Sequence, residues 1–150
     1  MTKGRSPGVR KERVMLKLIV GLKGSGKTKN LIELANRAVE TSPGHVVCVE
    51  RSNKLIFDIS HKVRLVDTET YGVKDAPELY GLICGILATN FDVKDLFVDS
   101  SLKICGNDVA AWVEFIGRLD ELCRKFEVNC VTTSSIDHKD LPKILEQYVY

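Results

Sequence analysis

The segment of residues 14–28 constrains the fold more than any other part of this 150-residue sequence. It begins with the apolar run VMLKLIV, residues 14–20, which has the length and composition of a buried β-strand. The run stops at Gly21, and a glycine-rich stretch follows it. Residues 27–40 then carry apolar side chains at helical spacing, ahead of a Pro-Gly pair. The segment therefore predicts a strand, a tight turn and a helix in immediate succession.

The turn itself has a pattern suited to binding phosphate. Glycines let successive backbone N–H groups line a phosphate-sized concavity, and the start of a helix adds partial positive charge. Lys27 has the reach to contact the β- and γ-phosphates of a nucleotide, and the Thr28 hydroxyl is suited to ligate Mg²⁺. The alternative is a glycine-rich turn with a solvated lysine. The pattern GxxxxGK[ST] is matched at all of its fixed positions by residues 21–28, which are Gly21, Leu22, Lys23, Gly24, Ser25, Gly26, Lys27 and Thr28.

A phosphate-bound Mg²⁺ needs a second anchor, usually a carboxylate at the end of a strand near the loop. Asp99 is the favoured candidate, because it directly follows the apolar run of residues 96–98. Asp67, after the apolar stretch of residues 63–66, is its competitor. The structural alternative for either acid is a surface residue that caps a strand.

The remaining pattern alternates strands with helices. This alternation implies a three-layer α/β/α architecture with a mainly parallel sheet of about five strands. No linker or internal repeat interrupts it, so residues 14–150 are expected to form one domain. The further strands are expected at 45–49, 63–66, 96–98 and 129–133, and the further helices at 75–91 and 108–126. The buried stripe of the last helix is expected to hold Trp112, Ile116, Leu119, Cys123 and Phe126.

The formal net charge of +2 conceals an asymmetry. Residues 1–13 hold five bases and one acid, so the remainder of the chain is slightly acidic. This basic segment is expected to be disordered. It is suited to contact nucleic-acid phosphates, although such tails are also common solubilising extensions.

Five cysteines without a CxxC pair argue against a disulfide framework and against a zinc ribbon. Cys48 and Cys130 lie in apolar runs and are expected in the core. The three histidines lack the spacing of metal ligands. No apolar run is long enough for a membrane span, and a cytoplasmic location is expected.

Residues 15–28 and 96–99 resemble the Walker A and Walker B motifs of P-loop NTPases. The strand at 129–133, with the following Ser134-Ser135, resembles the polar-tipped sensor strand of their additional-strand branch. The whole chain is similar to short bacterial P-loop proteins labelled ATP-binding or twitching-motility-like. The resemblance implies the P-loop NTPase fold and the binding of ATP with Mg²⁺.

The resemblance is incomplete after the Walker B aspartate. Many hydrolysing members carry an acid there, whereas Ser100 and Ser101 follow Asp99 in this chain. Glu50 is the candidate replacement, because a catalytic glutamate followed by arginine stands at the end of a different strand in RecA-like and rotary ATPases. The alternative is that Glu50 and Arg51 form a surface salt bridge.

The leading functional hypothesis is an ATP-binding protein with slow, Mg²⁺-dependent hydrolysis, in which nucleotide state alters contacts with a protein partner. The NKxD motif that recognises guanine and the DxxG motif that GTPases carry at the metal-binding aspartate are both absent, which favours ATP. One alternative is a small-molecule kinase of nucleoside type, although the zinc cysteines of thymidine kinases are missing. Another is a nucleic-acid-associated ATPase that uses the basic segment. The identity of the partner and a homo-oligomeric state stay open.

Overall fold

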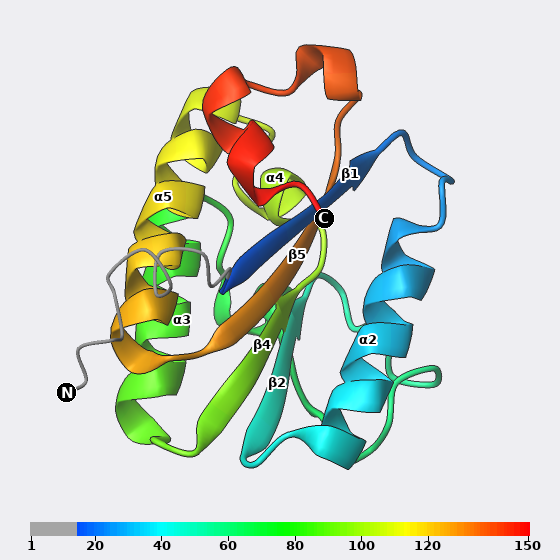
Figure 1. Ribbon diagram of the computed structural model, residues 1–150, viewed down its shortest axis with the longest axis vertical. Coiled ribbons are helices and arrows are strands. Elements are labelled where there is room, and N and C mark those ends of the chain that lie inside the picture. The colour runs from blue at the N-terminus through cyan, green and yellow to red at the C-terminus, as the bar shows by residue number, and fades with distance from the viewer. Residues whose placement is uncertain (1–14) are drawn as a thin grey trace, which may run out of the picture.

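The computed structural model describes residues 15–150, and its centre is a five-stranded sheet (Figure 1). All neighbouring strands are parallel, in the order β1-β5-β4-β2-β3. The expected α/β fold with a parallel sheet of about five strands is confirmed. The basic segment, residues 1–13, lies outside the described residues, as does Val14. The strands are β1 (Leu16–Gly21), β2 (His45–Glu50), β3 (Arg64–Asp67), β4 (Val93–Val98) and β5 (Asn129–Ser135).

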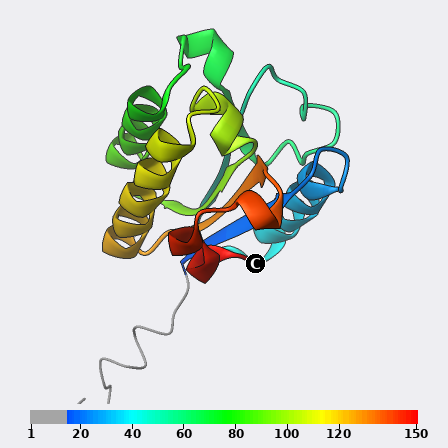
Figure 2. The same ribbon diagram turned by 90° about the horizontal axis from the view of Figure 1, so that it is seen from above.

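Helices cover both faces of the sheet (Figures 1 and 2). Helix α2 lies on one face, and α3 and α5 lie side by side on the other. The long helices are α2 (Lys27–Thr41), α3 (Ala76–Thr89) and α5 (Val109–Phe126). The shorter ones are α4 (Ser101–Ile104) and the 3₁₀ segments η1 (Thr68–Tyr71), η2 (His138–Asp140) and η3 (Lys143–Tyr148).

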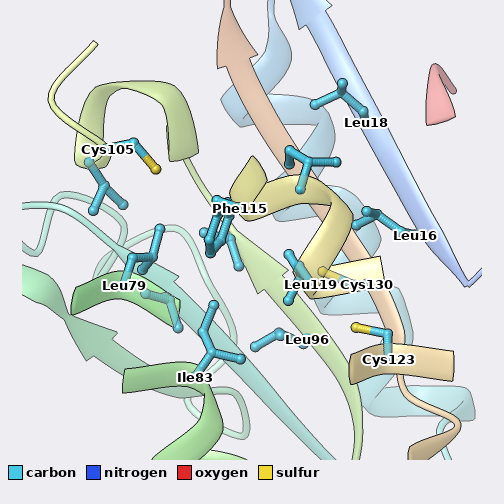
Figure 3. Close-up of a cluster of buried hydrophobic side chains, with 14 of the residues drawn as sticks. Leu16, Leu18, Leu79, Ile83, Leu96, Cys105, Phe115, Leu119, Cys123 and Cys130 are labelled. Atoms are coloured by element: carbon cyan, nitrogen blue, oxygen red, sulfur yellow. The ribbon is translucent and has the colours of Figure 1, made fainter. Parts of the chain in front are cut away.

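The two faces of the sheet have separate hydrophobic cores. The larger core lies under α3 and α5, as Figure 3 shows for Leu79, Phe115 and their neighbours. The smaller one lies under α2 and includes Leu31 and Cys48. Along β4, Leu96 belongs to the larger core and the adjacent residue, Phe97, to the smaller one. This alternation places buried side chains on both faces of the strand, as expected for a parallel sheet covered on both sides.

The expected buried positions of Cys48 and Cys130 are confirmed. One expected core residue is wrong, because the Phe126 side chain is 46% exposed. It is the last residue of α5, and the next residue, Glu127, turns the chain away with a left-handed φ of 55°. The buried stripe therefore ends one turn earlier, at Cys123.

Aspartate caps fix the starts of the two helices on the larger core. The Glu78 backbone N–H donates to the Asp75 carboxylate at the start of α3. Asp108 accepts a hydrogen bond from the Ala111 N–H in the same way at the start of α5. Such caps satisfy helix N–H groups that have no partner within the helix.

Among the described residues, the segment that follows η3 lies along the edge of β1 that no other strand covers. Val149 forms a single parallel bridge with Leu18, and the Tyr150 N–H donates to the Leu18 carbonyl over 2.9 Å. The Tyr148 hydroxyl donates to Asp120 of α5 over 3.0 Å. These bonds hold the segment against the strand that leads into the glycine-rich turn.

Within residues 15–150, no helix combines the length and the apolar character needed to cross a membrane.

Candidate functional site

The principal cavity lies at the carboxyl ends of the parallel strands, where open α/β sheets bind their ligands. Its volume is about 520 Å³. Its lining comes from the turn after β1, the ends of β2, β4 and β5, and the region around α4. We call residues 21–28, which connect β1 to α2, the glycine loop. The cavity brings together four residues that the sequence singled out for catalysis or metal binding, namely Lys27, Thr28, Glu50 and Asp99.

The glycine loop has the backbone geometry that its glycines permit. Gly24 and Gly26 have φ values of 86° and 87°, in the left-handed region that favours glycine. Gly26 is also the N-cap of α2, so the helix begins at Lys27. Lys23, Gly24 and Gly26 line the cavity, whereas the Leu22 side chain is 62% exposed. The first N–H groups of α2 therefore adjoin the cavity, which is the requirement for anion binding at a helix start.

The Lys27 side chain is folded into the glycine loop. Its Nζ donates to the Leu22 carbonyl over 2.8 Å and lies 3.5 Å from Ser25 Oγ. Burial lowers the pKa of the ammonium group, and the negative charge of Asp99 partly offsets that effect. The Lys27 ammonium group is thus held inside the glycine loop by the Leu22 carbonyl and the Ser25 hydroxyl, and an incoming anion can replace these two partners.

Thr28 and Asp99 are in direct contact although 71 residues separate them in the chain. The Thr28 hydroxyl lies 3.1 Å from Oδ1 of Asp99 and 3.3 Å from Oδ2. Asp99 directly follows β4, and its backbone N–H donates to the Val49 carbonyl over 2.9 Å. Its carboxylate therefore stands at the strand end and faces the first turn of α2.

Sequence analysis did not single out Thr133 as a site residue, yet it holds Asp99 in place. Its hydroxyl donates to Oδ1 of Asp99 over 2.7 Å. The same hydroxyl accepts a 2.8 Å hydrogen bond from the Ser100 N–H. The available signal was the run of hydroxyl side chains at the carboxyl end of β5, since Thr133 directly precedes Ser134-Ser135.

Glu50 ends β2 and is only 1% exposed. Oε1 accepts hydrogen bonds from the N–H groups of Lys54, at 2.8 Å, and Leu55, at 3.2 Å. Oε2 is buried and has no hydrogen-bond partner among residues 15–150. Burial raises the pKa of this carboxyl group, the two backbone N–H groups oppose the rise, and the charges of Asp67 and Asp99 add to it.

The structure assigns other roles to two alternatives from the sequence. Asp67, the competitor for the metal, caps the turn after β3, and its Oδ1 accepts from the N–H groups of Ser52 and Glu69. The suggested surface salt bridge between Glu50 and Arg51 is wrong, because Glu50 is buried. Arg51 instead lies 3.5 Å from Glu69 Oε2.

The cavity is strongly biased toward positive charge. Six basic residues and two acidic ones line it. A cleft lined mainly by one sign of charge concentrates ions of the other sign. Sequence reasoning missed three of the polar lining residues, which are far from the glycine loop in the chain: Lys54, Lys103 and Asn107.

Among residues 15–150, no three His, Cys, Asp or Glu side chains are grouped to hold a metal ion by themselves. Mg²⁺ commonly binds through one or two protein oxygens together with substrate phosphates and water. The adjacent Thr28 hydroxyl and Asp99 carboxylate fit that pattern, and the glycine loop fits the phosphates. The residues present are therefore compatible with a Mg²⁺–nucleotide pair.

Comparison with known proteins adds no relative to this picture: no protein-family model matches the chain, and a search of curated proteins found no match.

Proposed function

We propose that this protein binds ATP with Mg²⁺ on the glycine loop, hydrolyses it slowly, and changes its contacts with a protein partner according to the nucleotide bound. The observation that carries the proposal is the contact between Thr28 and Asp99 beside the loop. A hydroxyl and a carboxylate at this position suit a cation that bridges protein and phosphate. The resemblance to P-loop NTPases points to the same ligand.

Each residue of the loop has a distinct task in this proposal. The loop N–H groups and the start of α2 bind phosphate oxygens. Lys27 exchanges its bond to the Leu22 carbonyl for one to the terminal phosphates, so its charge is used where negative charge develops during phosphoryl transfer. Thr28 and Asp99 would hold Mg²⁺, which when bound would supply neutralisation of the phosphate charge.

Glu50 is the proposed general base. It is the second acid of the cavity, and its Oε2 has no hydrogen-bond partner among residues 15–150. A carboxylate that positions and deprotonates a nucleophile typically contributes 10²–10⁴-fold to a rate. Because Ser100 and Ser101 occupy the positions after Asp99, this task falls to Glu50, which lies on another strand.

Exposed apolar side chains next to the cavity support a switch that acts on a partner. Leu22 lies in the glycine loop, and Ile56 and Phe57 follow the lining residue Leu55. Phe57 is 94% exposed. In this proposal, a change of the nucleotide bound to the glycine loop alters how these apolar side chains contact the partner.

The test is calorimetric titration of the full chain with ATP and ADP in the presence of Mg²⁺. Lys27→Ala should weaken ATP binding by about tenfold to a hundredfold, the value of a hydrogen bond to a charged group. Lys74→Met, at an exposed lysine that does not line the cavity, is the matched control and should bind like wild type. Absence of nucleotide binding, or equal binding by Lys27→Ala, would contradict the proposal. Phosphate release that persists in Glu50→Gln would remove only the assigned base.

A further inference from the structure

The cavity extends beyond the site proposed for the nucleotide. Strand β4, which ends next to Asp99, lies between β5 and β2 in the sheet. Residues after β2 therefore lie on the other side of Asp99 from β1 and the glycine loop. We use the term far half for the part of the cavity lined by the loop after β2, by α4 and by the turn that follows α4. Its lining residues are Glu50, Arg51, Lys54, Leu102, Lys103 and Asn107.

The buried carboxyl group of Glu50 points to a ligand in the far half. Its side chain lines the cavity and is held in place by the backbone N–H groups of Lys54 and Leu55. Its second oxygen, Oε2, is buried without a partner among the described residues. A buried acceptor left without a hydrogen bond is costly. A ligand hydroxyl group would satisfy it.

The basic residues of the far half point to the charge of that ligand. Lys54 and Lys103 are exposed and form no salt bridge with any of residues 15–150. Arg51 has one long contact, 3.5 Å, with Glu69 at the surface. These three cations converge on one cavity from the loop after β2 and from α4. They are suited to a phosphate or carboxylate group.

We propose that the far half binds a second ligand beside the nucleotide: a small anionic molecule that presents a hydroxyl group to Glu50. The proposal rests on the proposed function, because the nucleotide is taken to occupy the glycine loop. At Glu50 Oε2 the ligand hydroxyl would take the place of the hydrolytic water, so the two would alternate at this oxygen. A nucleotide switch has no need of such a subsite, whereas a small-molecule kinase does. The second subsite therefore distinguishes the two classes.

The experiment uses the full chain saturated with Mg²⁺ and a non-hydrolysable ATP analogue, so that the positions of all three phosphates are occupied. Glycerol 3-phosphate, which has both a phosphate and hydroxyl groups, is titrated while backbone amide NMR signals are followed. A potassium chloride series of matched ionic strength separates binding from salt effects. We expect saturable shifts at Lys54, Lys103 and Asn107.

Two variants test the assigned contacts. Lys103→Met should weaken glycerol 3-phosphate binding by about tenfold, while Lys74→Met should leave it unchanged. Glu50→Gln should weaken glycerol 3-phosphate but not sulfate, which has negative charge and no hydroxyl group at neutral pH. The comparison of the two anions isolates the hydroxyl contact.

The outcomes separate this subsite from the nucleotide site. Failure of the ATP analogue to bind contradicts the proposed function. Analogue binding with no saturable glycerol 3-phosphate shifts, or shifts that potassium chloride reproduces, contradicts the second subsite alone. The subsite is also overturned if Lys103→Met weakens the analogue itself and not glycerol 3-phosphate, because Lys103 then belongs to the nucleotide site.

Discussion

Thr133 and Asp99 join two neighbouring strands at the edge of the sheet where the cavity lies. The Thr133 hydroxyl donates its proton to Oδ1 of Asp99 over 2.7 Å and accepts from the Ser100 N–H over 2.8 Å. Ser100 itself has a left-handed φ of 60°, uncommon for a residue with a side chain. The single Thr133 hydroxyl thus fixes both the orientation of the carboxylate and the sharp turn that follows it.

Replacing this hydroxyl should lower the free energy of unfolding and reduce the effect of Mg²⁺ on nucleotide binding. Thr133→Val keeps the shape of the side chain but leaves the Ser100 N–H without its acceptor and removes the shortest hydrogen bond to the Asp99 carboxylate. We expect a loss of about 1–3 kcal/mol in the free energy of unfolding, measured by urea denaturation. Thr133→Ser, which keeps the hydroxyl, should lose much less. If Thr133→Ser lost as much stability as Thr133→Val, the hydroxyl would contribute no more to stability than the methyl group does.

Asp99 should account for the metal dependence of nucleotide binding. Asp99→Asn retains an oxygen for the Thr28 and Thr133 hydroxyls but removes the negative charge. We therefore expect the gain in ATP affinity that Mg²⁺ provides over EDTA to fall by about tenfold, while the affinity in EDTA changes little. Titration calorimetry of wild type and Asp99→Asn with ATP, each in Mg²⁺ and in EDTA, measures this difference.

Asp67→Asn is the matched control for Asp99→Asn. The Asp67 carboxylate is engaged by the N–H groups of Ser52 and Glu69 at the end of β3. Its substitution should leave the effect of Mg²⁺ unchanged. If Asp67→Asn abolished that effect and Asp99→Asn did not, the metal would have to be reassigned.

Glu50 should make stability depend on pH in a specific direction. Burial raises the pKa of its carboxyl group in the folded protein above the ordinary value. The folded state then holds this proton more tightly than the unfolded state. The free energy of unfolding therefore falls as the pH rises from the pKa of the unfolded state to the higher pKa of the folded state. Glu50→Gln removes the titration. The free energy of unfolding of the variant relative to wild type should therefore increase from about pH 5 to about pH 8.

Thermal or urea denaturation at both pH values checks this sign. Glu40→Gln, at an exposed glutamate of α2, is the control and should show a difference that does not change with pH. A Glu50→Gln variant whose relative stability decreases toward higher pH would mean that the folded protein stabilises the charged carboxylate.

The sequence predicted the parts of the site that depend on local chemistry. The glycine loop and the acid after β4 are local patterns, and Asp75 and Asp108 lie at helix starts as expected. The expected strand of residues 96–98 was too short, since β4 begins at Val93. Lys94 and Asp95 interrupt the apolar run, but sheet pairing with β2 includes Asp95, so hydrogen bonding to a neighbouring strand outweighs local polarity.

Features that depend on distant contacts could not be predicted in this way. Parallel strands joined by helices are compatible with several strand orders, so the sequence did not place β5 between β1 and β4. The supporting role of Thr133 depends on that order. The contribution of Lys103 depends on α4, a helix of only four residues, too short to show a periodic pattern.

The buried hydroxyls behind Asp99 provide a final prediction. Ser101 Oγ accepts a 3.0 Å hydrogen bond from Trp112 Nε1 of α5 and lies 2.8 Å from Thr132 Oγ1. All three residues are fully buried, so the bond has no competition from solvent. It connects the turn after β4 to the middle of the larger core.

A double-mutant cycle of Ser101→Ala and Trp112→Phe measures this connection. Each single variant should be destabilised. Ser101→Ala leaves the buried Trp112 Nε1–H without its acceptor, and Trp112→Phe removes one hydrogen bond from Ser101 and creates a cavity. The second substitution should cost less once the first is present, with a coupling of about 1 kcal/mol in the free energy of unfolding. Strictly additive losses would mean that the Ser101–Trp112 bond contributes no net stability. The turn after Asp99 would then be held without help from α5, by the Thr133 hydroxyl, which accepts from the Ser100 N–H, and by the Ser134 hydroxyl, which accepts from the Leu102 N–H over 3.1 Å.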